Sequence, residues 1–131
     1  MENSEIEDLM SHAIEASKKA YSPYSKFNVG SAVITDDGAI FSGCNVENVS
    51  FGLTICAERT AIVKAISEGH KNIKAIAIYS PSGDISPCGA CRQFINEFGT
   101  DILVIYSLND SIRIKTIKEL LPDVFSEETL S

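Results

Sequence analysis

The sequence predicts an α/β protein with a mixed sheet of roughly five strands. Strand-like segments alternate with helical ones through the middle of the chain, which is typical of parallel strands joined by right-handed helical crossovers. The strongest strand signals are the apolar runs 73–79 and 102–106. The chain has 131 residues, 44% of them hydrophobic, enough for one core. Because no linker, repeat or low-complexity segment divides it, we expect a single domain over residues 1–131.

The N-terminal third predicts one helix followed by a hairpin. Apolar residues at helical spacing indicate a helix over 4–21, and Ser4 followed by Glu7 has the spacing of a capping box. Pro23 ends this pattern, because the residue before a proline avoids helical geometry. Strands are expected over 27–35 and 39–45, joined by an Asp-Gly turn.

The remaining elements follow the same alternation. Gly69 and Gly99 are expected to end the two central helices, and Pro122 follows the last helical turn. The predicted elements are a helix over 56–68, strands over 73–79, 102–106 and 112–115, a helix over 88–98 and a helical turn over 117–121. The acidic tail over 126–131 is expected to fray.

Two short cysteine stretches carry the chemistry of the sequence. The first is Cys56-Ala57-Glu58-Arg59-Thr60 and the second is Pro87-Cys88-Gly89-Ala90-Cys91-Arg92-Gln93. Three thiolates suit zinc, and a site with three protein ligands keeps a fourth position open for water. A carboxylate two residues from the first thiol could move protons for that water.

Element lengths predict that the two stretches meet. A helix of about 13 residues runs about 20 Å, and a strand of about 7 residues returns about 23 Å. The starts of the second and third helices should therefore lie at the same edge of the sheet, where open α/β sheets build ligand sites. Partial positive charge at helix N-termini also favours thiolate over thiol.

Two other interpretations of the cysteines remain open at this point. Cys44 could complete a closed, structural site of four thiolates, or Cys88 and Cys91 could form a redox pair. A structural site has no use for Glu58, and a redox pair needs no third cysteine. The order Cys-x-Glu followed by Pro-Cys-x-x-Cys is instead typical of zinc-dependent deaminases of nucleobases.

Charge and composition restrict the partners. The formal net charge is −7 and no basic block stands out, which disfavours a polynucleotide or an anionic membrane surface as a partner. No stretch is apolar enough to span a membrane, and the N-terminus lacks the features of a secretory signal. A cytoplasmic protein with a small, neutral substrate is expected.

The sequence resembles the short, homotetrameric, three-cysteine type of cytidine deaminase over nearly its whole length, from the first helix to Phe125. The resemblance implies a three-layer α/β/α fold, one zinc ion per subunit, active sites at subunit interfaces and a place in pyrimidine salvage. Besides the cysteine motifs, it rests on Tyr21-Ser22-Pro23-Tyr24-Ser25-Lys26-Phe27-Asn28-Val29-Gly30, Gly43-Cys44-Asn45-Val46-Glu47-Asn48 and Leu120-Leu121-Pro122.

At the metal, the resemblance implies that Cys56, Cys88 and Cys91 are the zinc ligands. Glu58 matches the general acid and base that moves protons while zinc-activated water attacks C4 of the base. Arg59 matches an arginine that hydrogen-bonds a ligand sulfur and offsets the negative charge of three thiolates on a dication.

The substrate contacts are implied in the same way. Asn45 and Glu47 match groups that hydrogen-bond the ribose, and Phe27 matches a ring that packs on the pyrimidine. The backbone N–H of Ala57 would help to hold the base. Phe125 matches an aromatic residue that reaches a neighbouring subunit's site.

The implied reaction is hydrolytic deamination of cytidine and deoxycytidine to uridine and deoxyuridine. The alternatives are a deaminase for another small aminated base, such as the related blasticidin S deaminases, and a structural zinc domain without catalysis. The segment 49–55 has no role that the sequence supports.

Overall fold

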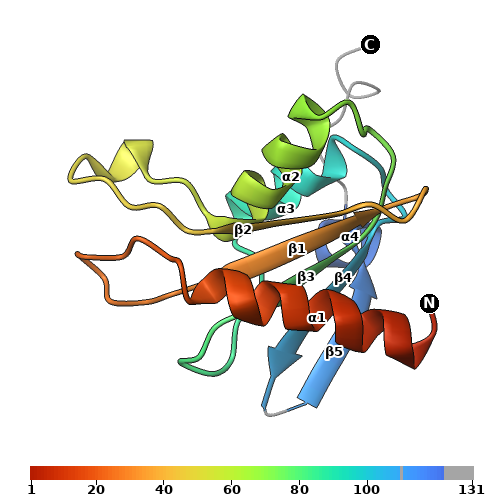
Figure 1. The fold of residues 1–131 in the computed structure, drawn as a ribbon, viewed down its shortest axis with the longest axis horizontal. Helices are drawn as coiled ribbons and strands as arrows, with labels where there is room; N and C mark the ends of the chain where they lie inside the picture. The colour runs from red at the N-terminus through yellow and green to blue at the C-terminus, as the bar shows by residue number, and fades with distance from the viewer. Residues whose placement is uncertain (110, 123–131) are drawn as a thin grey trace.

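The computed structural model describes residues 1–109 and 111–122, which form one five-stranded sheet and its covering helices (Figure 1). The strand order is β2-β1-β3-β4-β5. In chain order the elements are α1 (Asn3–Ser17), β1 (Gly30–Thr35), β2 (Ile40–Cys44), the 3₁₀ turn η1 (Phe51–Leu53), α2 (Ala57–Ser67), β3 (Ile73–Tyr79), α3 (Gly89–Asn96), β4 (Leu103–Leu108), β5 (Ser111–Thr116) and α4 (Ile117–Leu120).

The sheet is mixed, as predicted. Strands β3 and β4, which are joined through α3, pair in parallel. Strand β1 pairs antiparallel with both β2 and β3, and β4 pairs antiparallel with β5. The predicted parallel pairing in the middle of the sheet is therefore confirmed for one pair of strands.

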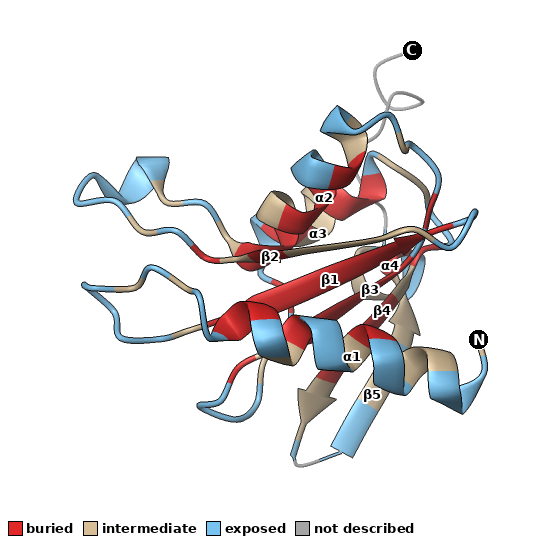
Figure 2. Cartoon of the chain, viewed as in Figure 1, coloured by how far each residue is buried: buried red, intermediate tan, exposed pale blue. Residues whose placement is uncertain are grey.

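Helices cover both faces of the sheet, which confirms the three-layer α/β/α fold. The alternation of side chains along β3 shows how the layers form, since successive residues of a strand point to opposite faces. Ala75 and Ala77 pack toward α1, whereas Ile76 and Ile78 pack in the cluster that holds α2 and α3. The small alanine side chains of β3 let α1 lie close to the sheet, and the larger isoleucine side chains fill the space between β3 and the helices α2 and α3. Figure 2 shows these strands buried beneath the helices.

The first helix differs from its prediction at both ends. It begins at Asn3, and the Glu5 carboxylate accepts a hydrogen bond from the Glu2 amide, so the predicted capping pair Ser4 and Glu7 is wrong. It ends at Ser17 rather than at residue 21, because the chain turns there to pair with a distant loop. The Tyr21 amide donates to the Asn45 carbonyl, and the Tyr21 carbonyl accepts from the Glu47 amide.

The first strand begins at Gly30, three residues later than predicted. Residues 22–29 form a loop that is held by side chains of residues 45 and 47 rather than by a neighbouring strand. The other predicted helices and strands are present, with boundaries shifted by a few residues. Within the described residues, no helix has the length and apolar character needed to cross a membrane.

Gly30 marks the closest approach of α1 to the sheet. A Cβ atom at this position would lie 1.9 Å from the Ala13 carbonyl oxygen and 2.4 Å from the Ser17 nitrogen. Both neighbours are helix backbone, which cannot move aside as a side chain can. We expect Gly30→Ala to lower the free energy of unfolding by about 3 kcal/mol, the upper end for an overpacked core.

Denaturant unfolding would measure this loss, with Gly52→Ala as the matched control. A Cβ atom on Gly52 meets nothing within 4 Å, so that variant should change stability by at most about 0.5 kcal/mol. Equal stability of the two variants would show that α1 does not pack as closely as described.

Candidate functional site

Both cysteine stretches begin a helix. Cys56 is the N-cap of α2 and Cys88 is the N-cap of α3, so each predicted helix starts one residue later than expected. The two helix starts meet, and the sulfur atoms of Cys56 and Cys91 lie 2.6 Å apart, within a hydrogen bond. The predicted convergence of the two stretches at one edge of the sheet is therefore confirmed.

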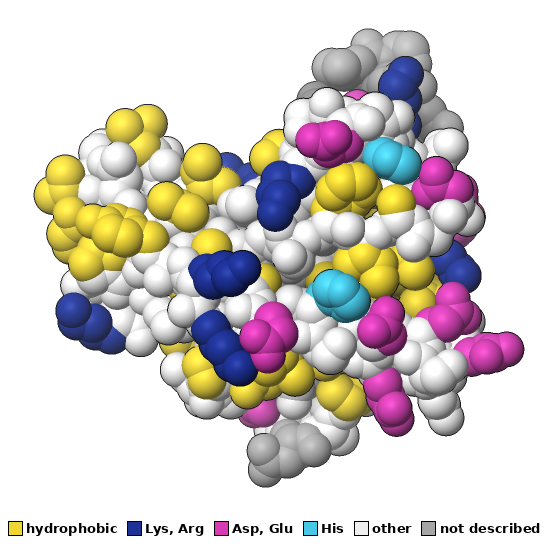
Figure 3. All heavy atoms as spheres, viewed as in Figure 1, with side chains coloured by type: hydrophobic (Ala, Val, Ile, Leu, Met, Phe, Trp, Pro, Cys, Tyr) yellow, Lys and Arg dark blue, Asp and Glu magenta, His cyan; other side chains and the backbone are white. Residues whose placement is uncertain are grey.

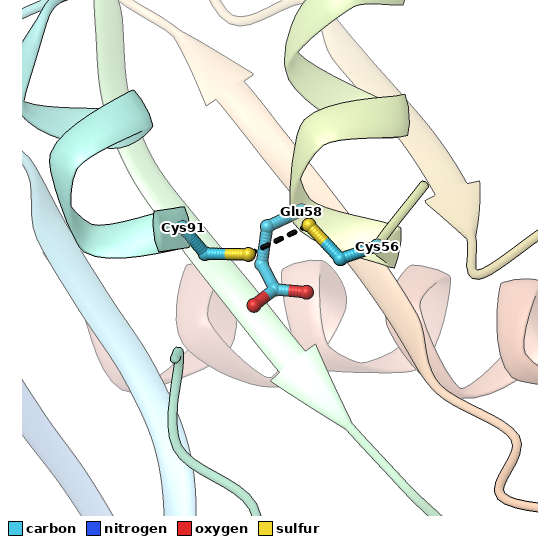
Figure 4. A group of neighbouring side chains, drawn as sticks. All are labelled: Cys56, Glu58 and Cys91. Atoms are coloured by element: carbon cyan, nitrogen blue, oxygen red, sulfur yellow. Dashed lines mark hydrogen bonds between the residues drawn. The ribbon is translucent and has the colours of Figure 1, made fainter. Parts of the chain in front are cut away.

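Three potential ligand groups lie together at this edge. One ligand atom each from Cys56, Glu58 and Cys91 lies within 4.8 Å of the other two. Figure 4 shows the three side chains pointing toward one another, with Glu58 and Cys56 at the start of α2 and Cys91 from α3. This is the one such group of three or more among residues 1–109 and 111–122.

Cys88 lies beside this group rather than within it. It is exposed, and its sulfur accepts a hydrogen bond of 3.4 Å from the Cys91 amide. It lines the same cavity as the other two cysteines. Cys44 lies apart, and its thiol donates to the Lys19 carbonyl at 3.5 Å. The geometry therefore does not support the closed four-cysteine site.

The hydrogen bond between Cys56 and Cys91 shifts the pKa values of the two thiols in opposite directions. A hydrogen bond from Cys91, with a further one from the Arg59 guanidinium, lowers the pKa of Cys56 to about 6. The Arg59 Nε–H donates to the Cys56 sulfur at 3.2 Å, and Nη2 donates to the Thr54 carbonyl at 3.2 Å. The hydrogen bond to Cys56 and burial raise the pKa of Cys91. Arg59 thus contacts the sulfur of one of the three predicted ligands, Cys56.

Glu58 is buried, with 5% of its surface exposed. Burial, followed by repulsion from the Cys56 thiolate, raises the pKa of Glu58 to about 7. A carboxyl group in such surroundings exchanges a proton readily near neutral pH, which is the property that a general acid and base needs.

One cavity is lined by the thiols, and a second cavity lies beside it. The inner cavity, of about 220 Å³, is lined by Val29, Asn45, Thr54, Cys56, Ala57, Glu58, Ile85, Ser86, Cys88 and Cys91. The outer one, of about 330 Å³, is lined by Tyr24, Ser25, Glu47, Phe51 and Thr54. Thr54 lines both cavities, so they lie side by side.

The predicted ribose contacts hold a loop of the protein itself. The Asn45 side chain accepts from the Val29 amide at 2.9 Å and donates to the Phe27 carbonyl at 2.8 Å. The Glu47 carboxylate accepts from the amides of Tyr24 and Ser25, at 3.0 and 3.1 Å, and from the Ser25 hydroxyl. Both polar groups are therefore fixed in place at the cavities.

One predicted substrate contact among the described residues is not brought into the cavities. Phe27 is 37% exposed and lines neither cavity, although its carbonyl is tied to Asn45. Phe125 lies outside the described residues. Ala57, by contrast, lines the inner cavity at the start of α2.

Sequence reasoning missed Thr54, Ile85 and Ser86, which line the inner cavity. The segment that holds Thr54 had no predicted role, and Ile85 and Ser86 lie between the predicted strand over 73–79 and the predicted helix over 88–98. The available signal was proximity, because Thr54 lies two residues before Cys56 and Ser86 lies two residues before Cys88.

The donor set fits a zinc ion. Cysteine sulfurs are preferred zinc ligands and bind the metal as thiolates. The hydrogen bonds from Cys91 and Arg59 that lower the pKa of Cys56 favour this form. Cys56, Cys88 and Cys91 would hold the ion, and Glu58 is placed beside them rather than needed as a fourth ligand.

Comparisons with known proteins identify the family. Residues 3–107 match the cytidine and deoxycytidylate deaminase zinc-binding region. The chain is 45% identical to the cytidine deaminase of Sporosarcina psychrophila over 97% of this chain and 96% of that protein. It is 47% identical to a probable cytidine deaminase of Dictyostelium discoideum, covering 99% and 90% of the two chains.

A solved structure agrees with these matches. The crystal structure of cytidine deaminase from Burkholderia pseudomallei superimposes with a TM-score of 0.86 at 43% identity, covering 95% of this chain and all of that one. Blasticidin-S deaminase of Bacillus cereus is less similar, at 36% identity over 75% of this chain and 76% of that protein. The zinc-binding region that residues 3–107 match places this chain in the cytidine and deoxycytidylate deaminase family.

Proposed function

We propose that this protein is a zinc-dependent hydrolase that converts cytidine and deoxycytidine to uridine and deoxyuridine with release of ammonia. The observation that carries the proposal is the convergence of Cys56, Cys91 and the buried Glu58 at one cavity. The family match and the full-length similarity to cytidine deaminases support the same reaction. A structural zinc domain would not need a buried carboxyl group beside the metal ligands.

In this proposal Cys56, Cys88 and Cys91 would hold the zinc ion, which would lower the pKa of a water molecule so that it can act as the nucleophile. Glu58 would accept the first proton of this water and deliver it to ring N3 while the water oxygen bonds to C4. It would then carry the second proton, from the new C4 hydroxyl, to the exocyclic nitrogen, whose bond to C4 breaks to release ammonia. The pKa of Glu58 near 7 suits a group that must both accept and donate. Arg59 offsets the charge of the thiolates through its contact with Cys56.

In this proposal the base and the sugar of the substrate occupy different parts of the two cavities. The inner cavity would take the pyrimidine, with the Ala57 amide as a donor to the base. Asn45 and Glu47 would hold the ribose where the cavities meet. Phe27 would pack on the ring after a movement of the loop that it belongs to. A 5′-phosphate gains nothing from the Glu47 carboxylate, which favours a free nucleoside.

The pH dependence of binding tests the role of Glu47. Hydrogen bonds from the Ser25 hydroxyl and amide and the Tyr24 amide lower the pKa of Glu47. Because the pKa of Glu47 lies below the ordinary value of about 4.5, the side chain is ionised at pH values above 4.5. It becomes protonated only when the pH falls through the lowered pKa. Glu58, whose pKa is raised to about 7, titrates in the same site of every variant, so the contribution of Glu47 is measured as a ratio of two Kd values. We expect the ratio of the uridine Kd of a variant that lacks the Glu47 charge to that of the wild type, measured by calorimetry, to stay constant between pH 8 and pH 5.

Glu47→Gln is the matched variant for that titration. It keeps the size of the side chain but removes the charge-assisted hydrogen bonds, so uridine should bind about 10-fold more weakly at every pH. If the ratio of the variant Kd to the wild-type Kd falls severalfold between pH 6 and pH 5, Glu47 does not hold the sugar as an ionised group.

Substrate identity is tested by comparing rates of ammonia release from four compounds. Cytidine and deoxycytidine should react, whereas deoxycytidine monophosphate and blasticidin S should react much more slowly. The full-length similarity to cytidine deaminases supports this order. A rate with blasticidin S above that with cytidine would leave the chemistry in place and overturn the substrate assignment.

Exposed apolar residues beside the outer cavity support a homotetramer with sites at subunit interfaces. Phe51 is 78% exposed and lines that cavity, and Val49 and Leu53 are also exposed. Figure 3 shows hydrophobic side chains gathered on the protruding end of the molecule at left. Apolar patches of this kind mark contact surfaces. Phe125 of a neighbouring subunit would complete the site, and sedimentation at increasing protein concentration tests for a tetramer.

The free thiols support a location for the protein, and the proposed reaction supports a metabolic role. Four free thiols suit a reducing compartment, which supports a cytoplasmic protein. Conversion of free cytidine to uridine would serve pyrimidine salvage.

A further inference from the structure

Arg92 links the second cysteine stretch to the end of the last helix. It follows Cys91 on α3 and is half-buried. Its Nε–H donates to the Pro87 carbonyl and its Nη1–H donates to the Leu120 carbonyl, both at 2.8 Å. One rigid, planar guanidinium group therefore joins the peptide before Cys88 to the last residue of α4.

The bond to Pro87 fixes the direction in which the chain enters Cys88. The peptide between Pro87 and Cys88 is planar, so holding its carbonyl oxygen also holds the nitrogen and the Cα atom of Cys88, from which the side chain projects. Pro87 is fully buried, whereas Cys88 is exposed and its sulfur accepts one weak hydrogen bond, from the Cys91 amide.

The bond to Leu120 gives the guanidinium a fixed support. The carbonyls in the last turn of a helix lack helical partners, and a cation satisfies them well. Two donors in a fixed fork hold their acceptors at a defined separation, which a lysine ammonium cannot do. The position of Pro87 is thereby coupled to that of α4.

From these contacts we propose that Arg92 is a positioning residue that holds Cys88 in place as a zinc ligand and couples the metal site to α4. It differs from Arg59, which contacts a sulfur directly, because it acts through the main chain. The inference rests on the proposed ligand role of Cys88.

Zinc release to a chelator tests this role without measuring turnover. Groups that orient metal ligands typically contribute 10- to 100-fold to metal affinity, so Arg92→Gln should release zinc about 10- to 100-fold faster than the wild type. Arg92→Lys, which retains a donor for one carbonyl, should show a smaller acceleration. If Arg92→Gln does not fold, the rate of zinc release from Arg92→Lys provides the test in its place.

Lys64→Gln is the matched control, since Lys64 also donates to a backbone carbonyl, that of Ser42, away from the thiols. It should release zinc at the wild-type rate. The denaturation midpoint of each zinc-free variant shows whether its fold is intact. A wild-type release rate in folded Arg92→Gln, or an equal acceleration in Lys64→Gln, would overturn the proposal.

A double-mutant cycle separates this proposal from the ligand assignment. If Arg92 acts through Cys88, Arg92→Gln should add little to the release rate in a Cys88→Ala background. Full acceleration in that background would mean that Arg92 acts elsewhere. If Cys88→Ala alone leaves zinc release unchanged, then Cys88 is not a ligand, and the proposed metal set fails together with the role of Arg92.

Discussion

Glu58→Gln should lower the turnover of cytidine by about 10³- to 10⁴-fold while leaving zinc bound. Glutamine has nearly the same shape as glutamate, but its amide group cannot accept a proton from the water and release it to the base. Glu58 is 5% exposed and lines the inner cavity, so bulk water is poorly placed to replace it. The loss should appear in kcat at saturating cytidine, because the proton transfers belong to the reaction rather than to binding.

The variant is also expected to fold. Burial already favours the neutral form of Glu58, whose pKa is raised to about 7, so a neutral amide suits the position. Metal analysis and a thermal melt beside the wild type check both conditions. Near-normal kcat in the folded, zinc-loaded variant would show that another group moves the protons.

Cys91→Ala should weaken zinc binding by roughly 10²- to 10³-fold. A structural zinc site draws about 10–16 kcal/mol from its full ligand set, so each ligand accounts for several kcal/mol. Cys91 is 1% exposed and its sulfur lies against that of Cys56, at the centre of the thiol group. Competition with a chelator of known affinity measures the loss.

Cys44→Ala is the matched control, because Cys44 is a free thiol outside the group and its sulfur contacts the Lys19 carbonyl. It should bind zinc and turn over cytidine as the wild type does. If Cys44→Ala loses zinc as readily as Cys91→Ala, the ion is held by four thiolates in a closed site, and catalysis there has no open position.

The parts of the structure that local patterns determine could be predicted from the sequence. The run 73–79 alternates in a way that suits a strand buried on both faces, and it forms β3 with those bounds. The two cysteine stretches were expected at helix starts on one edge of the sheet, and the short distance between Cys56 and Cys91 follows from that arrangement.

The parts that depend on distant contacts could not be predicted. Residues 18–21 look like the end of a helix and residues 27–29 like the start of a strand. The backbone of Tyr21 and the side chains of Asn45 and Glu47 instead hold this part of the chain as a loop. Phe27 consequently lies outside both cavities. The close approach of α1 to Gly30 also could not be predicted from one sequence. A glycine within a strand indicates first of all a position that weakens the strand.

The most direct test of the account is to follow the ultraviolet absorbance of cytidine with one protein sample that is loaded with zinc, stripped by a chelator and loaded again. We predict conversion to uridine with the first load, loss of conversion after stripping, and recovery on reloading, with no conversion at any stage by Glu58→Gln. Folded, zinc-loaded protein that leaves cytidine unchanged would contradict the account, as would conversion that continues unaltered after the metal is removed.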